Sequence, residues 1–166
     1  MTEKSTRLWL RTDSVDTVVD APAEHVYDLA ADLVRMGEWS PECAEVEFLD
    51  GATEAAEGVT FIGHNRTGPG GKIRWSRHGR VLAADRGREF AFITDEGGRE
   101  STEWRYRFEP VEGGTRVTES YVVHWIPTWA RIGDVLLNRT KDLQKNMAHT
   151  LGQLKSAAEA TASSQA

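Results

Sequence analysis

The chain has 166 residues and a formal net charge of −6, with 39% hydrophobic and 28% charged residues. This length suits one domain with one core, and the composition is that of an ordinary globular protein. The acidic balance disfavours nucleic-acid binding, and the single cysteine, Cys43, excludes an internal disulfide or a cysteine-based metal cluster. Residues 1–20 contain no apolar run long enough for a signal peptide or a membrane span, so we expect a cytoplasmic protein.

The first part of the chain predicts a strand followed by short helices. Residues 1–13 read as a polar extension, and the domain is expected to cover residues 14–160. Residues 15–20 favour a short strand. Pro22 then suits a first helical turn, and apolar residues recur at helical spacing up to residue 33. One or two short helices are therefore expected, ending near Gly37.

The apolar period then becomes two, which is typical of strands. Six runs follow this pattern, at residues 44–49, 59–66, 72–84, 89–94, 102–109 and 115–125. Glycine-rich turns separate most of them, which favours an antiparallel meander. From residue 128 to about residue 160 the apolar spacing returns to that of a helix, before a frayed tail at 161–166. The expected fold is α+β: about seven antiparallel strands in a curved sheet, two short helices, and one long C-terminal helix across one face.

Strand alternation places large aromatic and several polar side chains on one face of the sheet, because residues two apart share a face. This face collects Phe61, Trp75, Phe90, Phe92, Trp104, Tyr106, Phe108 and Tyr121, with Asn65, Arg77 and Glu119 among them. An unpaired buried charge is very costly. Two interpretations stay open: Arg77 and Glu119 pair inside a core, or the face borders a partly wet cavity. One helix cannot cover a wide sheet, which favours the cavity.

Two stretches resemble a known superfamily. They are VDAPAEHVYDLAADLVRMGEWSPE (residues 19–42) and WRYRFEPVEGGTRVTESY (residues 104–121), followed by the long amphipathic helix. Together they resemble the SRPBCC superfamily, with its START-like, birch-pollen-allergen-like helix-grip fold, over residues 14–158. The resemblance implies a hydrophobic cavity between the curved sheet and the long helix, and points to the polyketide cyclase/dehydrase-like branch. The superfamily also hosts lipid carriers and hormone receptors, so it specifies the fold more closely than the function.

The resemblance also implies site residues. Aromatase/cyclase members keep an arginine on the strand that matches residues 72–84, a polar side chain near Tyr121, and a tryptophan in the loop that matches Trp39. The arginine corresponds to Arg77. This sequence departs from those members around that loop and at the start of the C-terminal helix. The residues expected to bind a ligand are Trp39, Phe61, Asn65, Trp75, Phe90, Phe92, Trp104, Tyr106, Trp125 and Trp129.

The candidate catalytic residues are Arg77, Glu119 and Tyr121. Arg77 either anchors a carboxylate, enolate or phenolate oxygen or pairs with Glu119. Glu119 is a candidate general base if burial raises its pKa, and is otherwise structural. The two tyrosines, Tyr106 and Tyr121, either donate hydrogen bonds to a ligand or pack in the core. The five histidines lack metal-ligand spacing, so neither a metal nor another cofactor is expected.

Three functions stay open at this point. The first is binding of a hydrophobic polyketide-, lipid- or aromatic-like small molecule in the cavity. The second is a cofactor-independent polyketide aromatase/cyclase or dehydratase. The third is an interaction module that uses a basic outer face of the sheet, formed by Arg66, Arg74, Arg80, Arg105, Arg107 and Arg116. The expected partner is a hydrophobic small molecule and not a nucleic acid, and the chain is expected to be a monomer or a homodimer.

Overall fold

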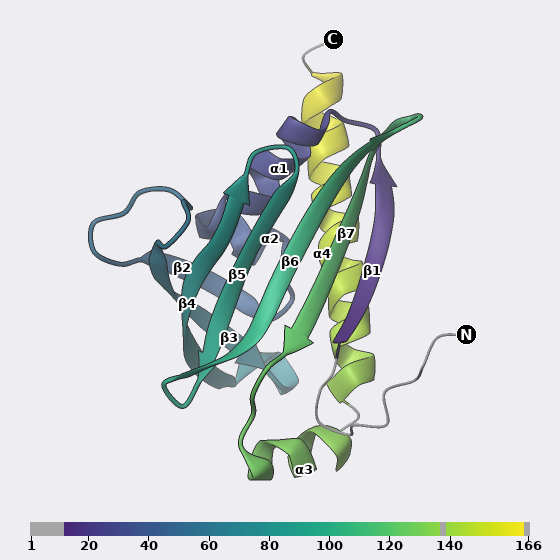
Figure 1. The fold of residues 1–166 in the computed structure, drawn as a ribbon. Coiled ribbons are helices and arrows are strands. Elements are labelled where there is room, and N and C mark those ends of the chain that lie inside the picture. Colours follow the sequence, from purple (N-terminus) through teal and green to yellow (C-terminus); the bar gives the residue numbers. More distant parts are fainter. Residues whose placement is uncertain (1–11, 137–138, 165–166) are drawn as a thin grey trace.

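The fold is a curved antiparallel sheet with helices on one face (Figure 1). The computed structural model describes residues 12–136 and 139–164. Seven strands lie in the order β1-β7-β6-β5-β4-β3-β2. The long helix α4 runs behind β7 and β1, and α1 lies behind the upper part of the sheet in the same view. This arrangement confirms the expected α+β helix-grip architecture.

The elements follow the expected order along the chain. The strands are β1 (Thr12–Val19), β2 (Cys43–Phe48), β3 (Thr60–Thr67), β4 (Ile73–Asp85), β5 (Glu89–Glu96), β6 (Arg99–Val111) and β7 (Gly114–Val123). The helices are α1 (Ala23–Ala31), α2 (Met36–Trp39), α3 (Thr128–Leu136) and α4 (Arg139–Ser163), with 3-10 helices at Leu33–Arg35 and Pro69–Gly71. Most of the predicted extension (1–11) and the last two residues of the predicted tail lie outside the described residues.

Strand pairing aligns the predicted aromatic face across the sheet. Phe92 of β5 lies opposite Trp104 of β6, and Trp104 lies opposite Tyr121 of β7. The next row joins Phe90, Tyr106 and Glu119 in the same way. A bulge shifts the β4–β5 register between residues 81 and 83, beyond the stretch that carries Trp75 and Arg77. The alternation of that stretch is therefore preserved, and we call this helix-facing side of the sheet the inner face.

One half of the inner face is a closed core. Tyr27 of α1 packs edge-on against Phe90 and Phe108, with ring centroids 6.2 and 5.6 Å apart. Leu151 and Leu154 of α4 are buried in the same cluster. Burial of each such side chain stabilises the fold by about 1.5–3 kcal/mol. The predicted aromatic face is thus solid core at the end covered by α1.

The C-terminal region differs from the predicted single helix. The structure describes two helices, α3 and α4, which run in different directions, and α3 lies beyond the lower ends of the strands in Figure 1. Trp129 and Ile132 of α3 are 71% and 59% exposed, so they do not pack on the sheet as the helical stripe predicted. Helical spacing of apolar residues indicates that they share one face of a helix, but it does not show where one helix ends and another begins in a new direction. At the other end α4 continues to Ser163, into the predicted frayed tail.

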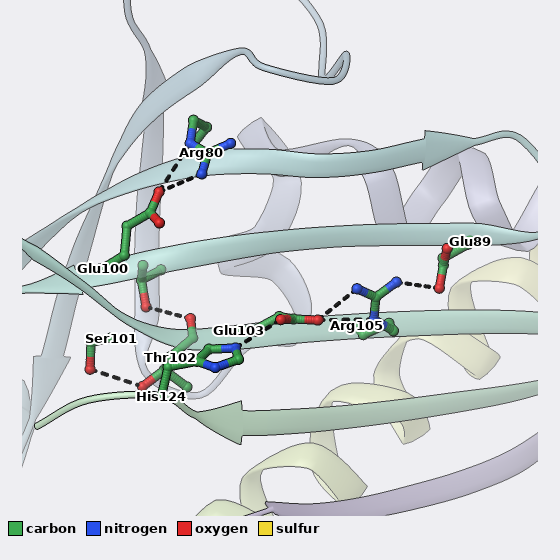
Figure 2. A network of polar contacts seen from close by, with 9 residues as sticks. Arg80, Glu89, Glu100, Ser101, Thr102, Glu103, Arg105 and His124 are labelled. Carbon is green, nitrogen blue, oxygen red and sulfur yellow. Dashed lines mark hydrogen bonds and ion pairs between the residues drawn. The ribbon is translucent and has the colours of Figure 1, made fainter.

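The outer face of the sheet carries alternating charges (Figure 2). Arg105 lies between Glu89 and Glu103, and Glu103 also faces Nε2 of His124 at 2.9 Å. Further pairs are Arg80–Glu100, Arg107–Glu89 and Arg116–Asp16. Four of the six arginines predicted on this face therefore have a carboxylate partner, which reduces the positive potential there. Such exposed pairs each contribute at most about 1 kcal/mol.

Candidate functional site

A cavity of about 310 Å³ lies between the inner face and the helices. The sheet contributes Phe61 and Asn65 from β3, Trp75 and Arg77 from β4, Phe92 and Thr94 from β5, Trp104 and Tyr106 from β6, and Glu119 from β7. The helical side contributes Leu33, Met36, Leu143, Asn146 and Met147. A volume of this size is at the lower end of the range of small-molecule sites, and the walls combine apolar surface with a few polar groups, as such sites do.

Two glycines of the inner face have opposite roles in shaping the cavity. A Cβ on Gly79 would lie 2.2 Å from the ring of Phe61, so this ring packs directly against the Gly79 backbone. A Cβ on Gly63 would meet nothing closer than 4.0 Å, and Gly63 lines the cavity. Gly63, and not Gly79, therefore leaves open space beside Arg77, its cross-strand partner.

Glu119 and Tyr106 form a buried pair in the cavity wall. Their side chains are 4% and 3% exposed, and the Tyr106 hydroxyl donates a hydrogen bond to Oε1 of Glu119 at 2.8 Å. Oε2 of Glu119 is buried and has no hydrogen-bond partner among the described residues. Burial raises the pKa of Glu119 to about 8, against a smaller lowering by the Tyr106 hydrogen bond. At neutral pH the carboxyl group is therefore mostly protonated.

Two arginine–carboxylate pairs also line the cavity. Arg77 of β4 pairs with Glu96 at the end of β5, and both side chains are partly exposed. Arg139, at the start of α4, donates to both carboxylate oxygens of Glu42, with the Nη2–Oε2 bond at 2.7 Å. Asn146 donates to the same carboxylate at 2.9 Å. These pairs tie β4 to β5, and α4 to the segment before β2, around the same space.

Of the two interpretations of Arg77, the pairing with Glu119 is wrong. Arg77 pairs with Glu96, and Glu119 accepts its hydrogen bond from Tyr106. The reason is position along the strands. Arg77 lies beyond the Gly79–Thr94 pair, near the C-terminal end of β5. Glu119 lies in the same cross-strand row as Phe90 and Tyr106, which is nearer the closed core.

The structure brings most of the predicted site residues together. Those that line the cavity are Phe61, Asn65, Trp75, Arg77, Phe92, Trp104, Tyr106 and Glu119. Those that lie outside its lining are Trp39, Phe90, Tyr121, Trp125 and Trp129.

Each residue outside the lining has another environment. Trp39 is buried with Arg35 over its ring at 5.2 Å. The ring of Tyr121 is buried 5.5 Å from that of Trp104. Trp125 lies under Arg99 at 4.7 Å. Phe90 belongs to the closed core, and Trp129 is exposed.

Sequence reasoning did not find Glu42, Glu96, Arg139 or Asn146. Glu96 had a usable signal, because it follows Thr94 by two residues on the strand next to Arg77. Glu42 and Arg139 are separated by 97 residues and lie in a loop and at a helix start, where periodicity says nothing. Cys43 also lines the cavity, and burial raises its pKa to about 11, so it is a neutral thiol near pH 7.

The sequence matches a family model described as "Polyketide cyclase / dehydrase and lipid transport" over residues 12–159. The chain therefore belongs to this family, in agreement with the SRPBCC resemblance of its sequence. No curated protein matches the sequence. Within the described residues, no helix has the length and apolarity needed to cross a membrane, and no three His, Cys, Asp or Glu side chains form a group able to hold a metal ion.

Solved structures with the same fold include aromatase/cyclases. The di-domain ARO/CYC StfQ from the steffimycin biosynthetic pathway has a TM-score of 0.76 at 14% identity, covering 95% of this chain and 53% of that one. The present chain thus spans about half the length of StfQ. The Zhui aromatase/cyclase from Streptomyces sp. R1128 has a TM-score of 0.63 at 17% identity, with 90% and 94% covered. A protein from Thermus thermophilus has a TM-score of 0.63 at 24% identity, with 91% and 99% covered. These likenesses establish the fold.

Proposed function

We propose that the cavity binds a largely apolar, oxygenated small molecule of the polyketide kind, and that Glu119 exchanges a proton with it. The observation that carries the proposal is the Glu119 carboxyl group. It lies in the cavity wall, it has a pKa of about 8, and its Oε2 has no partner among the described residues. A general acid or base works best when its pKa is near the working pH. Family membership supports the same chemistry.

A cyclisation or dehydration needs the two protonation states that Glu119 offers. The minor ionised form removes a proton from a carbon between two carbonyl groups, and the resulting enolate attacks another carbonyl carbon to close a ring. The protonated carboxyl group then gives its proton to the alkoxide that forms, which becomes a hydroxyl group. In the dehydration that follows, the carboxylate takes a proton from the neighbouring carbon and gives it to the leaving hydroxyl group, so water departs and Glu119 is again ionised, as at the start. The Tyr106 hydroxyl holds Oε1 and thereby orients the carboxyl group.

The charges around the cavity favour a neutral ligand over an anionic one. Arg77 and Arg139 each already pair with a carboxylate, Glu96 and Glu42. With Glu119 protonated, these cavity charges cancel. An anionic ligand would have to displace one of the two carboxylates, whereas a polyketone carries its oxygens as neutral carbonyl groups. Arg77 remains a candidate donor to a carbonyl oxygen, whereas the sequence suggested that it anchors a carboxylate, enolate or phenolate oxygen.

Passive binding of a hydrophobic molecule is the second candidate function. The observation that favours it is the same cancellation of charge, because a neutral cavity with aromatic walls also suits a carrier. In that case the Glu119–Tyr106 hydrogen bond is only structural. The two functions differ in one consequence: a carrier binds the molecule and returns it unchanged.

The test compares wild type with Glu119→Gln on a synthetic poly-β-ketone. Binding is followed by tryptophan fluorescence, which Trp75 and Trp104 in the cavity wall make sensitive to a ligand. Products are followed by liquid chromatography and mass spectrometry. We expect wild type to change the distribution of cyclised and dehydrated products relative to buffer. Glu119→Gln should bind the polyketone but give the buffer distribution, and Glu109→Gln, an exposed control on β6, should behave as wild type.

Two results would decide against the proposal. If Glu119→Gln gives the wild-type products, proton transfer by this carboxyl group is excluded. If wild type binds the polyketone but gives the buffer distribution, the carrier function stands in its place. Native mass spectrometry of freshly expressed protein adds an independent observation, since a co-purified small molecule would define the ligand class directly.

A further inference from the structure

Exposed apolar side chains gather at one end of the molecule. Among the described residues, the three large hydrophobic side chains with the greatest exposure are Trp129 (71%), Ile132 (59%) and Ile73 (58%). Trp129 and Ile132 are three residues apart on α3, so they share one side of that helix. Single exposed apolar residues are common, but a group of them at one place marks an interaction site.

Strand register places Ile73 and α3 at the same end of the sheet. β7 ends at Val123, and Val123 lies in one cross-strand row with Thr102, Thr94 and Gly79. Ile73 lies six residues beyond Gly79 on β4, further toward the same end. The chain leaves β7 there and continues into α3, which lies beyond the lower ends of the strands in Figure 1.

This end is also where the cavity has its polar rim. Ile73 lies two residues before Trp75 on the inner face of β4, and Trp75 lines the cavity. On α3, Ala130 lines the cavity while its neighbour Trp129 is exposed. The partly exposed Arg77–Glu96 pair belongs to the same cavity lining. Ile73 and Trp129 thus lie close to lining residues on two elements, β4 and α3.

Cations flank the exposed Ile73. Arg66 of β3 and Arg74 of β4 lie directly opposite each other, and Lys72 precedes Ile73. No carboxylate lies within ion-pair distance of these three cations in the part of the chain that the structure describes. The other four arginines of the outer face each have a carboxylate partner. Like charges directly opposite each other on two strands are unfavourable unless an anion lies between them.

We propose that this end of the molecule docks on an anionic lipid bilayer, with Trp129, Ile132 and Ile73 in the interface and Lys72, Arg66 and Arg74 on the headgroups. Tryptophan beside apolar residues and cations is the combination that binds the bilayer interface. An acidic protein or a nucleic acid would use the cations but would leave three apolar side chains in water. Docking in this orientation turns the rim of the cavity toward the bilayer, so that a hydrophobic molecule can pass between them without crossing water.

The inference goes beyond the proposed chemistry, because docking does not depend on Glu119. It is tested with the full chain by flotation with vesicles of phosphatidylcholine, alone or with one third phosphatidylglycerol. Wild type should bind the anionic vesicles at low salt, and high salt should weaken this binding because it screens the headgroup charge. The variants are Trp129→Ala and the double variant Lys72→Glu/Arg74→Glu, and each should lower the partition coefficient about tenfold or more.

Matched controls come from the opposite end of the sheet. Val18→Ser removes an exposed apolar side chain near the end of β1, and Arg88→Glu reverses an exposed cation beside the β4–β5 turn. Both should bind vesicles as wild type does. Trp129→Phe should retain most of the binding, and circular dichroism verifies that each variant is folded.

Three results would overturn the inference. The first is absence of wild-type binding to anionic vesicles at low salt. The second is binding that Trp129→Ala and the double variant leave unchanged, which would put the contact elsewhere. The third is that neither wild type nor Trp129→Ala binds the vesicles while both are retained equally on an acidic polymer such as heparin, which would define an electrostatic site for an acidic macromolecule.

Discussion

Replacing Glu119 with glutamine should remove a large pH dependence from the stability of this protein. The carboxyl group has a pKa of about 8 in the folded protein, compared with 4.5 for a free glutamate side chain. Burial is the main cause, because the charged form loses its hydration on entering the cavity wall. Between these two pH values the folded state holds a proton that the unfolded chain has lost. The free energy of unfolding therefore falls as the pH rises through this window.

The size of the effect follows from the difference between the two pKa values. Each pH unit of the window contributes about 1.4 kcal/mol, so the loss between pH 4.5 and pH 7 is about 3 kcal/mol and the full loss above pH 8 is about 5 kcal/mol. A domain of this kind has a total stability of about 5–15 kcal/mol, so a loss of this size is readily measured. The glutamine side chain of the variant resembles the protonated acid and does not titrate. The variant should match wild type near pH 5 and exceed its stability by several kcal/mol near pH 9.

Urea unfolding followed by circular dichroism, in steps from pH 5 to pH 9, measures the difference. Other groups titrate over this range as well, but they are common to both proteins and cancel when the two stabilities are subtracted. A difference between wild type and variant that stays constant from pH 5 to pH 9 would refute the reasoning. It would mean that the carboxylate reaches water or a cation in the folded protein.

Three further changes test the neighbouring contacts. Tyr106→Phe removes the hydrogen bond that lowers the Glu119 pKa, so the carboxyl titration, followed by carbon-13 NMR, should move to higher pH; an unchanged midpoint contradicts the contact. Glu96→Gln leaves Arg77 without its carboxylate, so an anionic naphthalene sulfonate dye should bind about fivefold or more tightly, while a neutral naphthalene should bind as before. Gly79→Ala should destabilise the fold by about 1–3 kcal/mol in urea unfolding, because the added methyl group contacts the ring of Phe61. Gly63→Ala adds a methyl group with no atom closer than 4.0 Å, so it should keep the stability of wild type and weaken dye binding. Equal stability of the two variants would show that Phe61 moves freely.

The architecture was predictable because two signals agreed along the whole chain. Period-two alternation defined the strands, and turn residues separated them, so the antiparallel order left little freedom. The inner face followed from the same alternation, and the register confirms it for Trp75, Phe92 and Trp104. Alternation was reliable here because the β4–β5 shift, between residues 81 and 83, lies beyond the part of β4 that carries Trp75 and Arg77.

Position along each strand was less accessible than the face. Alternation says that Arg77 and Glu119 are on the inner face, but it does not say how far apart they lie on it. That distance depends on the register of three intervening strand pairs, and each pair can carry a shift of its own. The contacts of Glu42 with Arg139 are further removed from any local pattern, because they join a loop to the start of a helix. The separation of α3 from α4 is likewise a tertiary feature that an apolar stripe does not record.

The two halves of the inner face explain how the fold tolerates the buried Glu119 carboxyl group. At the end covered by α1, Tyr27 fills the space against Phe90, and this packing is close and apolar. Toward α3 the same face and α4 enclose the cavity, with Leu143, Asn146 and Met147 of α4 in its lining. Glu119 lies at the boundary, in the same cross-strand row as Tyr106 and Phe90, so the closed core holds its backbone while its carboxyl group borders the cavity. Ionisation of Glu119 at this position would lower the stability of the fold by about 5 kcal/mol, and the neighbouring core stabilises the fold enough to tolerate this loss.

A carboxyl group placed one row further into the core would have no contact with a ligand. One placed at the rim beside Arg77 would be ionised at neutral pH. The boundary is the position on this sheet where a carboxyl group can be both desolvated and in contact with a ligand.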